Sequence, residues 1–427
     1  MNVVVVSGTF PPMKAGGAEY ALRLCERLAQ AGSQVSVITS RIEGVATAPG
    51  VSVFPEMRHW SWWELSGLLD RICRLRPDVV NLHFTGDIYR GQPMVTFLPT
   101  LIKRRIPGVR FVTLFEHTAG VYPSRRRPFP LVAREIVARC LGAQKLTGGY
   151  GTLLRDSDAV IVLSDAHRAV FSRHYDGLDP KCVLIPPPPL LPMRAEDGGA
   201  ARRHGREKLG ISDDTFLVAY YGYLYPGKGI ETLLRAVAMA PAGLRVVLIG
   251  GTNEVALRVL KRPDYLAELK GLADELGVQD QLLWSGYYPS GSDVASLYLR
   301  AADACVLPFD GGVYLNNSSF AAAAAHGLPI ITTEGEMLES PFLEGDNVLL
   351  CPPQNPGALA AAMTGLHEDR VLRQRLAQGA LRLAAEWFSW DRTVDRTLEC
   401  FRGGEASGAA DPDASARPRV ATRTRGG

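Results

Sequence analysis

Short apolar segments rich in β-branched residues alternate with helical patterns along most of the chain. Each segment is bounded by turn residues, which is typical of strands buried on both faces of a parallel sheet. Between the first two, apolar residues recur at helical spacing and Gly32 follows where a helix should stop, so the pattern predicts a βαβ unit. The strand candidates of the first half are Val3–Val6, Val35–Thr39, Val79–His83, Phe111–Phe115, Ala159–Leu163 and Val183–Ile185.

The alternation stops at Pro186–Pro189 and resumes after a polar, Gly/Arg-rich stretch that ends near Lys208. Such a stretch cannot pair as a strand, and it predicts an interdomain linker. Two Rossmann-like α/β units in tandem are the simplest interpretation. The second series of strand candidates is Phe216–Tyr221, Arg245–Ile249, Leu282–Trp284, Ala304–Leu307 and Ile330–Thr332.

A chain of 427 residues exceeds what one hydrophobic core usually organises. The C-terminal stretch is rich in Gly, Ala and Arg and has little to bury, so we expect it to be disordered. The predicted parts are a first domain over 1–187, a linker over 188–208, a second domain over 209–385, a helix over 386–402 and a disordered tail over 403–427.

Composition and charge exclude several classes of protein. A net charge of +3 is too small to indicate a nucleic-acid partner. No apolar stretch approaches the roughly 20 residues of a membrane span, and the N-terminus lacks a signal-peptide pattern, so we expect a cytoplasmic protein. The seven cysteines are scattered without CxxC spacing, which favours neither disulfides nor a zinc site.

Candidate anion-binding groups follow the first strand of each half. Gly16 and Gly17 precede a helix, where backbone N–H groups and the helix dipole favour an anion. Their spacing is not GxGxxG, so NAD is not supported, and a flexible turn is the alternative. In the second half, Lys228 stands between two glycines after a strand and is placed to meet phosphate, although an isolated lysine is more often mere surface.

A third candidate is the start of an alanine-rich helix. Ser318 or Ser319 suits its N-cap and Gly327 its C-terminal stop, so its N-terminus would face the loop after a strand, where a diphosphate could bind. A capped core helix is the alternative. No Asp-x-Asp pair follows a strand, so no metal is predicted.

These segments in their order resemble the large family of retaining glycosyltransferases with the GT-B fold, which includes sucrose synthases and bacterial mannosyltransferases. The similarity extends from Met1 to about Phe401. It rests on the spacing of Pro12, Gly16-Gly17 and Glu19, of Gly222 with Lys228-Gly229, of Trp284-Ser285-Gly286, of Ala302-Asp303 with Leu307-Pro308, and of His326-Gly327-Leu328-Pro329.

The resemblance implies two doubly wound domains facing a cleft, with a C-terminal helix that crosses back to the first domain. The first domain would bind the acceptor and the second a nucleotide-diphosphate sugar, with no further cofactor. The sugar would be transferred with retention in polysaccharide, glycoconjugate or secondary-metabolite synthesis, to a small-molecule, glycan or lipid-linked acceptor. A nucleotide-sugar epimerase and a catalytically weak nucleotide-binding pseudoenzyme are the alternatives.

Individual roles are carried over from the family by position. His117 and Lys228 are the expected catalytic residues. The donor would contact Gly16, Gly17, Gly222, Lys228, Tyr287, Asn316, Asn317, Ser318 and Ser319, and the acceptor Gly17, His83 and His117.

The chain departs from the family in three places. Tyr223 stands where an arginine is usual, and Tyr314 and Ala322 replace two glutamates. The loop resembles a subgroup in which two arginines occupy the places of Asn316 and Asn317. Amides can hydrogen-bond a phosphate or a hydroxyl but bring no charge.

A basic run, Arg125–Arg127, precedes the apolar residues 129–132. One interpretation is a lip that makes weak peripheral contact with an anionic membrane. A solvated loop is the favoured alternative.

Overall fold

A computed structural model describes residues 1–427 except 121–127, 144–148, 193–197, 242, 290–291 and 404–427. Its strands form two sheets, and every pairing between named strands is parallel. The strands are β1 Asn2–Ser7, β2 Gln34–Ser40, β3 Val51–Met57, β4 Val79–Phe84, β5 Arg110–Phe115, β6 Ala159–Val162, β7 Cys182–Leu184, β8 Phe216–Tyr221, β9 Leu244–Ile249, β10 Leu282–Gly286, β11 Ala304–Leu307, β12 Ile330–Thr333 and β13 Leu349–Cys351.

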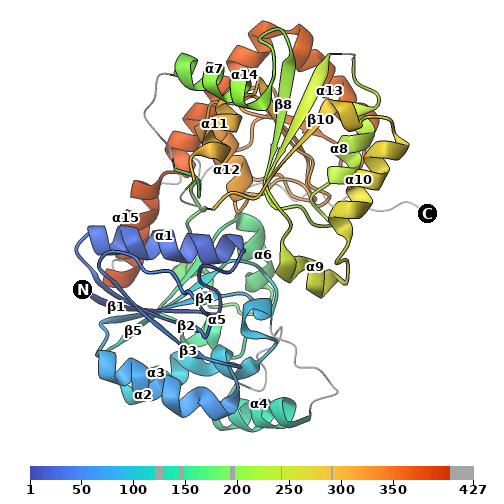
Figure 1. Ribbon diagram of the computed structural model, residues 1–427. Helices are drawn as coiled ribbons and strands as arrows, with labels where there is room; N and C mark the ends of the chain where they lie inside the picture. Colours follow the sequence, from blue (N-terminus) through green and yellow to red (C-terminus); the bar gives the residue numbers. More distant parts are fainter. Residues whose placement is uncertain (121–127, 144–148, 193–197, 242, 290–291, 404–427) are drawn as a thin grey trace.

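The two sheets share one topology. The first has the order β3-β2-β1-β4-β5-β6-β7 and the second β10-β9-β8-β11-β12-β13, so the strand order reverses between β1 and β4 and between β8 and β11. Ligands of such sheets bind outside the carboxyl ends of the strands at this switch point. Figure 1 shows the resulting two lobes, one above the other. The expected fold of two tandem doubly wound units is confirmed.

Helices cover the sheets and join their strands. α15 packs beside α1 on the first lobe (Figure 1). Trp390 at the start of α15 stacks on Tyr20 of α1, with ring centroids 6.0 Å apart. The expected return of the C-terminal helix to the first domain is therefore confirmed. The helices are α1 Gly16–Gln30, α2 Leu65–Leu75, α3 Leu98–Arg105, α4 Pro128–Cys140, α5 Leu153–Asp156, α6 Asp165–Ser172, α7 Gly198–Leu209, α8 Ile230–Val237, α9 Glu254–Leu260, α10 Tyr265–Glu275, α11 Val294–Ala301, α12 Ser318–Ala325, α13 Pro356–Glu368, α14 Arg370–Trp387 and α15 Trp390–Arg402.

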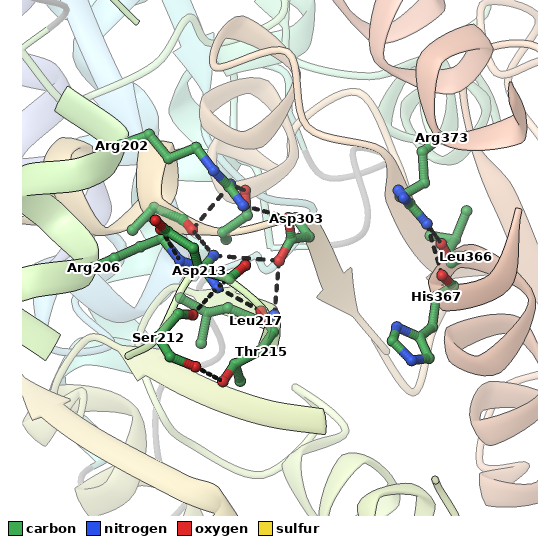
Figure 2. Close-up of polar contacts among 12 residues, drawn as sticks. Arg202, Arg206, Ser212, Asp213, Thr215, Leu217, Asp303, Leu366, His367 and Arg373 are labelled. Carbon is green, nitrogen blue, oxygen red and sulfur yellow. Dashed lines mark hydrogen bonds and ion pairs between the residues drawn. The ribbon is translucent and has the colours of Figure 1, made fainter. Parts of the chain in front are cut away.

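Part of the segment predicted as a linker is a helix. α7 occupies the second half of residues 188–208 and packs against α11. Its Arg206 is 1% exposed and reaches the amino ends of β8 and β11, where it donates to the carbonyl oxygen of Ala301. It also donates to the carbonyl oxygen of Ser212 (Figure 2). The local composition did not indicate this helix, because long-range contacts stabilise it; the linker and domain bounds stay a prediction.

Two further expectations fall on segments whose structure is not described. The predicted disordered tail begins at 403, and residues 404–427 lie outside the described residues, as do Arg125–Arg127 of the predicted basic lip. Within the described part of the chain, no helix has the length and apolar character needed to cross a bilayer.

A half-buried histidine at the end of α12 makes the free energy of unfolding depend on pH. The Nδ1 of His326 lies 2.7 Å from the Ala322 carbonyl and its Nε2 lies 2.7 Å from the Ser296 hydroxyl. Burial lowers the pKa of His326 to about 4. In the unfolded chain, this histidine has a pKa near 6.5, so at pH 5 it binds a proton there but not in the folded chain. The contribution of neutral His326 to the free energy of unfolding is therefore complete above about pH 6.5 and is lost as the pH falls toward 4.

We expect His326→Gln to remove this dependence. From pH 7 to pH 4.5 the wild-type protein should lose about 2–3 kcal/mol of unfolding free energy relative to the variant, as measured by urea unfolding. The same substitution at exposed His59 is the control and should follow the wild type. Parallel pH profiles of the wild type and His326→Gln would contradict the assignment.

Candidate functional site

Two adjoining cavities lie at the carboxyl ends of the strands. The large cavity, about 710 Å³, is lined by loops of both domains, and the small cavity, about 170 Å³, lies mainly in the second domain. Gly16, Lys228 and Ser318 line both cavities and so mark their junction. The large cavity also contains Gly17, His117, Asn316 and Asn317, and the small cavity contains Gly222, Tyr287 and Ser319.

Lys228 is held at the junction by a tight loop. The next residue, Gly229, has φ +71°, and a Cβ there would lie 1.7 Å from the Pro308 carbonyl oxygen, so only glycine lets this loop approach the one after β11. The Lys228 Nζ lies 4.8 Å from the centre of the Phe309 ring and 5.1 Å from that of Tyr225. Among the described residues it forms no ion pair, so its charge is available to an anion.

The N-terminus of α12 lies at the junction of the two cavities. Its first residues, Ser318 and Ser319, line the cavities, and Ser319 lies against Gly222 of the loop after β8. Asn317 precedes the helix, but its side-chain oxygen accepts from the Tyr314 N–H at 2.7 Å and is used within the loop. Unpaired N–H groups at a helix start, together with the dipole, attract a phosphate.

Two of the tyrosines that line the small cavity contact the first domain. The rings of Tyr223 and Tyr287 stack with centroids 6.2 Å apart, and both hydroxyls donate to Glu19 Oε1 of α1, at 3.2 and 3.3 Å. Burial raises the pKa of Glu19, and these two hydrogen bonds oppose the rise. Tyr223 therefore replaces the usual arginine with a neutral contact between the domains.

His117 is open to the large cavity from the loop after β5. Burial by its surroundings lowers its pKa, the Asp87 carboxylate opposes this change, and Lys228 adds to it. The ring therefore favours the neutral form. It lies 6.0 Å from the His167 ring, whose Nε2 is 3.2 Å from the Asn316 amide nitrogen of the second domain.

Glu339 links the loop before α12, which contains Asn316, to the first domain. Its side chain is 2% exposed, and Oε1 accepts from the backbone N–H groups of Asp165 at 2.5 Å and Ala166 at 3.3 Å, at the start of α6. Oε2 accepts from the N–H of Leu315, just before Asn316. Burial raises the pKa of Glu339 to about 7, against the effect of the three donors. This carboxylate therefore couples the loop before α12 to the first domain.

The expected acceptor residue His83 does not line either cavity. It is fully buried in β4, with Nε2 3.0 Å from Asn81 Oδ1 and Nδ1 3.7 Å from Glu116 Oε1. Its neighbours Glu116 and Tyr20 line the large cavity instead. Direct contact of His83 with an acceptor is thus unsupported, because the strand directs this side chain into the core.

Several cavity residues were absent from the predicted site. Glu19 belongs to the first motif, Glu116 stands next to His117, and Tyr314 was named only as a departure from the family, so the sequence did point to all three positions. Glu339 lies outside every motif. Ala322, the other departure, is fully buried within α12 and faces no cavity. Within the described residues, no group of three or more His, Cys, Asp and Glu side chains could hold a metal ion.

Comparison with protein families assigns both halves of the chain. Residues 15–188 match "Glycosyltransferase Family 4" and residues 201–382 match "Glycosyl transferases group 1". D-inositol 3-phosphate glycosyltransferase of Actinosynnema mirum is 30% identical over 417 residues, which cover 91% of this chain and 92% of that protein. The Thermomonospora curvata protein of the same name is 29% identical over 285 residues, and the alignment spans 61% of its length and 64% of this chain.

Solved structures agree with the fold. Sucrose-phosphate synthase from Thermosynechococcus elongatus superposes with a TM-score of 0.70 at 19% identity, over 94% of this chain and 98% of that one. HepE from Anabaena, in complex with UDP-glucose, superposes with a TM-score of 0.66 at 16% identity, over 94% and 99%. Together with the full-length similarity to a curated glycosyltransferase, these matches show that the chain belongs to the group 1 glycosyltransferases with the GT-B fold.

Proposed function

We propose that this chain transfers a sugar from a nucleotide-diphosphate sugar to an acceptor hydroxyl with retention of anomeric configuration. The observation that carries the proposal is the convergence of Lys228, the N-terminus of α12 and the Gly16 turn at the junction of the two cavities. One cation and two helix starts at a single point suit a diphosphate.

The cavities suggest how a donor would be arranged. The nucleotide would occupy the small cavity beside Tyr287, the diphosphate the junction, and the sugar the large cavity near His117 and Asn316. The Oδ1 atom of Asn316 is buried without a hydrogen-bond partner among the described residues, and a sugar hydroxyl could donate to it.

The transfer needs no protein nucleophile in this arrangement. The acceptor oxygen would bond to the anomeric carbon on the face from which the diphosphate leaves, and a phosphate oxygen would take the hydroxyl proton. The chain would align the two substrates and stabilise the charge that develops on the leaving diphosphate. Lys228 and the start of α12 would provide most of that stabilisation.

The comparisons support a nucleotide-sugar donor in general terms. HepE is described in complex with UDP-glucose, and the curated relatives are named for D-inositol 3-phosphate. Those names do not identify the base, the sugar or the acceptor that this chain uses, because specificity depends on individual side chains of the site.

The first experiment is a thermal-shift screen of nucleotide-diphosphate sugars, because a ligand of the native state raises the melting temperature. Any donor that binds is then incubated with candidate acceptors, and the anomeric proton of the product is assigned by NMR. A product with inverted configuration would contradict retention. Conversion of the donor sugar without acceptor would favour the epimerase alternative, and nucleotide binding without transfer would favour the pseudoenzyme.

A further inference from the structure

The first-domain wall of the large cavity is acidic. Asp87 and Glu116 line it, in the loops after β4 and β5. Among the described residues that line this cavity, the only lysine or arginine is Lys228, which comes from the second domain and lies at the junction with the small cavity. Apart from Lys228, the described charged and polar residues that line this cavity are therefore negative or neutral.

The side chain of Glu116 lies in the large cavity against Gly17, at the start of α1. A Cβ on Gly17 would lie 2.0 Å from Glu116 Oε2, so the missing side chain at Gly17 provides the space in which the carboxylate lies. The other oxygen, Oε1, is buried, has no hydrogen-bond partner among the described residues, and lies 3.7 Å from Nδ1 of the buried His83, which also has none there. At 3.7 Å the two atoms are too far apart for a direct hydrogen bond. Buried polar atoms without partners are costly, so a hydroxyl or amino group of a ligand would complete the hydrogen bonding of this carboxylate.

Two neutral side chains that line the same cavity also have a buried polar atom without a partner in the described part of the chain. Tyr20 is 3% exposed and Thr9 is 2% exposed, both line the large cavity, and the hydroxyl of each is buried without a partner among the described residues. Hydroxyls can both donate and accept, whereas a carboxylate only accepts. Together they match a ligand with several hydroxyl or amino groups.

We propose that the acceptor is a polyol that carries hydroxyl or amino groups and no phosphate or carboxylate, and that Glu116, Tyr20 and Thr9 bind it. An anionic acceptor would be placed against Glu116 and Asp87, and like charges brought together in a binding site are strongly unfavourable. The inference rests on the proposed function, because it assigns the acceptor half of the same site.

The test compares matched pairs of small polyols in the presence of the nucleoside diphosphate that most raises the melting temperature. Myo-inositol is compared with D-inositol 3-phosphate, and glucose with glucose 6-phosphate, by ligand-observed NMR titration; glucosamine is included as the amine. We expect the unphosphorylated member to bind about tenfold more tightly or better, which corresponds to one like-charge contact avoided.

Two nearly isosteric variants attribute the preference to the carboxylates. Glu116→Gln should reduce the ratio of the two affinities by about threefold or more, and Asp87→Asn should reduce it in the same direction. Asp70→Asn removes one charge from the same domain at an exposed site that lines neither cavity, and should leave the ratio unchanged. The melting temperature of each variant with the nucleotide verifies that the fold and the donor half are intact.

The outcomes separate this inference from the proposed function. If no nucleotide binds at all, the proposed function fails. If a nucleotide binds but the phosphorylated members bind as well as or better than their partners, or no unphosphorylated member binds, the acceptor inference is overturned while the donor assignment stands. An unchanged ratio in both variants would remove the carboxylates from the explanation.

Discussion

Lys228→Ala is expected to lower the rate of sugar transfer about a hundredfold or more, while the protein folds normally. The lysine lies at the junction of the two cavities, between the rings of Tyr225 and Phe309, and forms no ion pair among the described residues. Its charge therefore contributes little to the fold. In the proposed reaction, negative charge accumulates on the leaving diphosphate when the donor bond breaks, and a fixed cation stabilises that state most strongly.

The effect should appear mainly in kcat, because the interaction strengthens as the diphosphate leaves. Steady-state kinetics with the identified donor measure it, and thermal melting verifies the fold. Lys270→Ala removes the same charge from the exposed side of α10 and should transfer sugar at the normal rate. Normal turnover of Lys228→Ala would exclude Lys228 from the site.

The interior strands were predictable because they are buried on both faces. β1 and β8 read as continuous apolar segments, and their predicted positions agree with the structure to within one residue at each end. The edge strands β3 and β13 were missed. β3 contains Pro55 and is only partly buried, so it lacks the continuous apolar pattern of a central strand. β13 is apolar but has only three residues, which is too short for a sequence pattern to identify a strand.

The site residues that lie in a single strand-to-helix loop could be predicted from the glycines and helix-capping residues of that loop. Gly16, Lys228 and Ser318 each follow a strand and precede a helix, and all three meet where the two cavities join. Long-range partners carried no such signal. Glu339 binds backbone groups of α6, more than 170 residues away in the chain. His83 was predicted to contact the acceptor. Its side chain is buried, because its direction depends on how the strand lies in the folded sheet, which the sequence does not show.

Arg206→Ala is expected to lower the free energy of unfolding of the second domain by about 3–5 kcal/mol, the usual cost of breaking a buried charge network. Its guanidinium donates to the carbonyl oxygens of Ala301, Ser212 and Thr215, and it lies 3.4 Å from Asp303, whose carboxylate also accepts from the Leu217 N–H (Figure 2). Removing it would take one donor from each of these three carbonyl oxygens and would leave the buried network around Asp303 incomplete.

The neighbouring Arg202 provides the matched control. It also binds Asp303, with Nη2 2.6 Å from Oδ1, but its side chain is 36% exposed, against 2% for Arg206. Arg202→Ala should therefore cost only about 1 kcal/mol, as for a solvent-screened pair. Urea unfolding of both variants measures the difference, and equal losses would contradict the role assigned to burial. Because this network lies at the amino ends of β8 and β11, opposite the cavities, folded Arg206→Ala should transfer sugar at the wild-type rate per molecule.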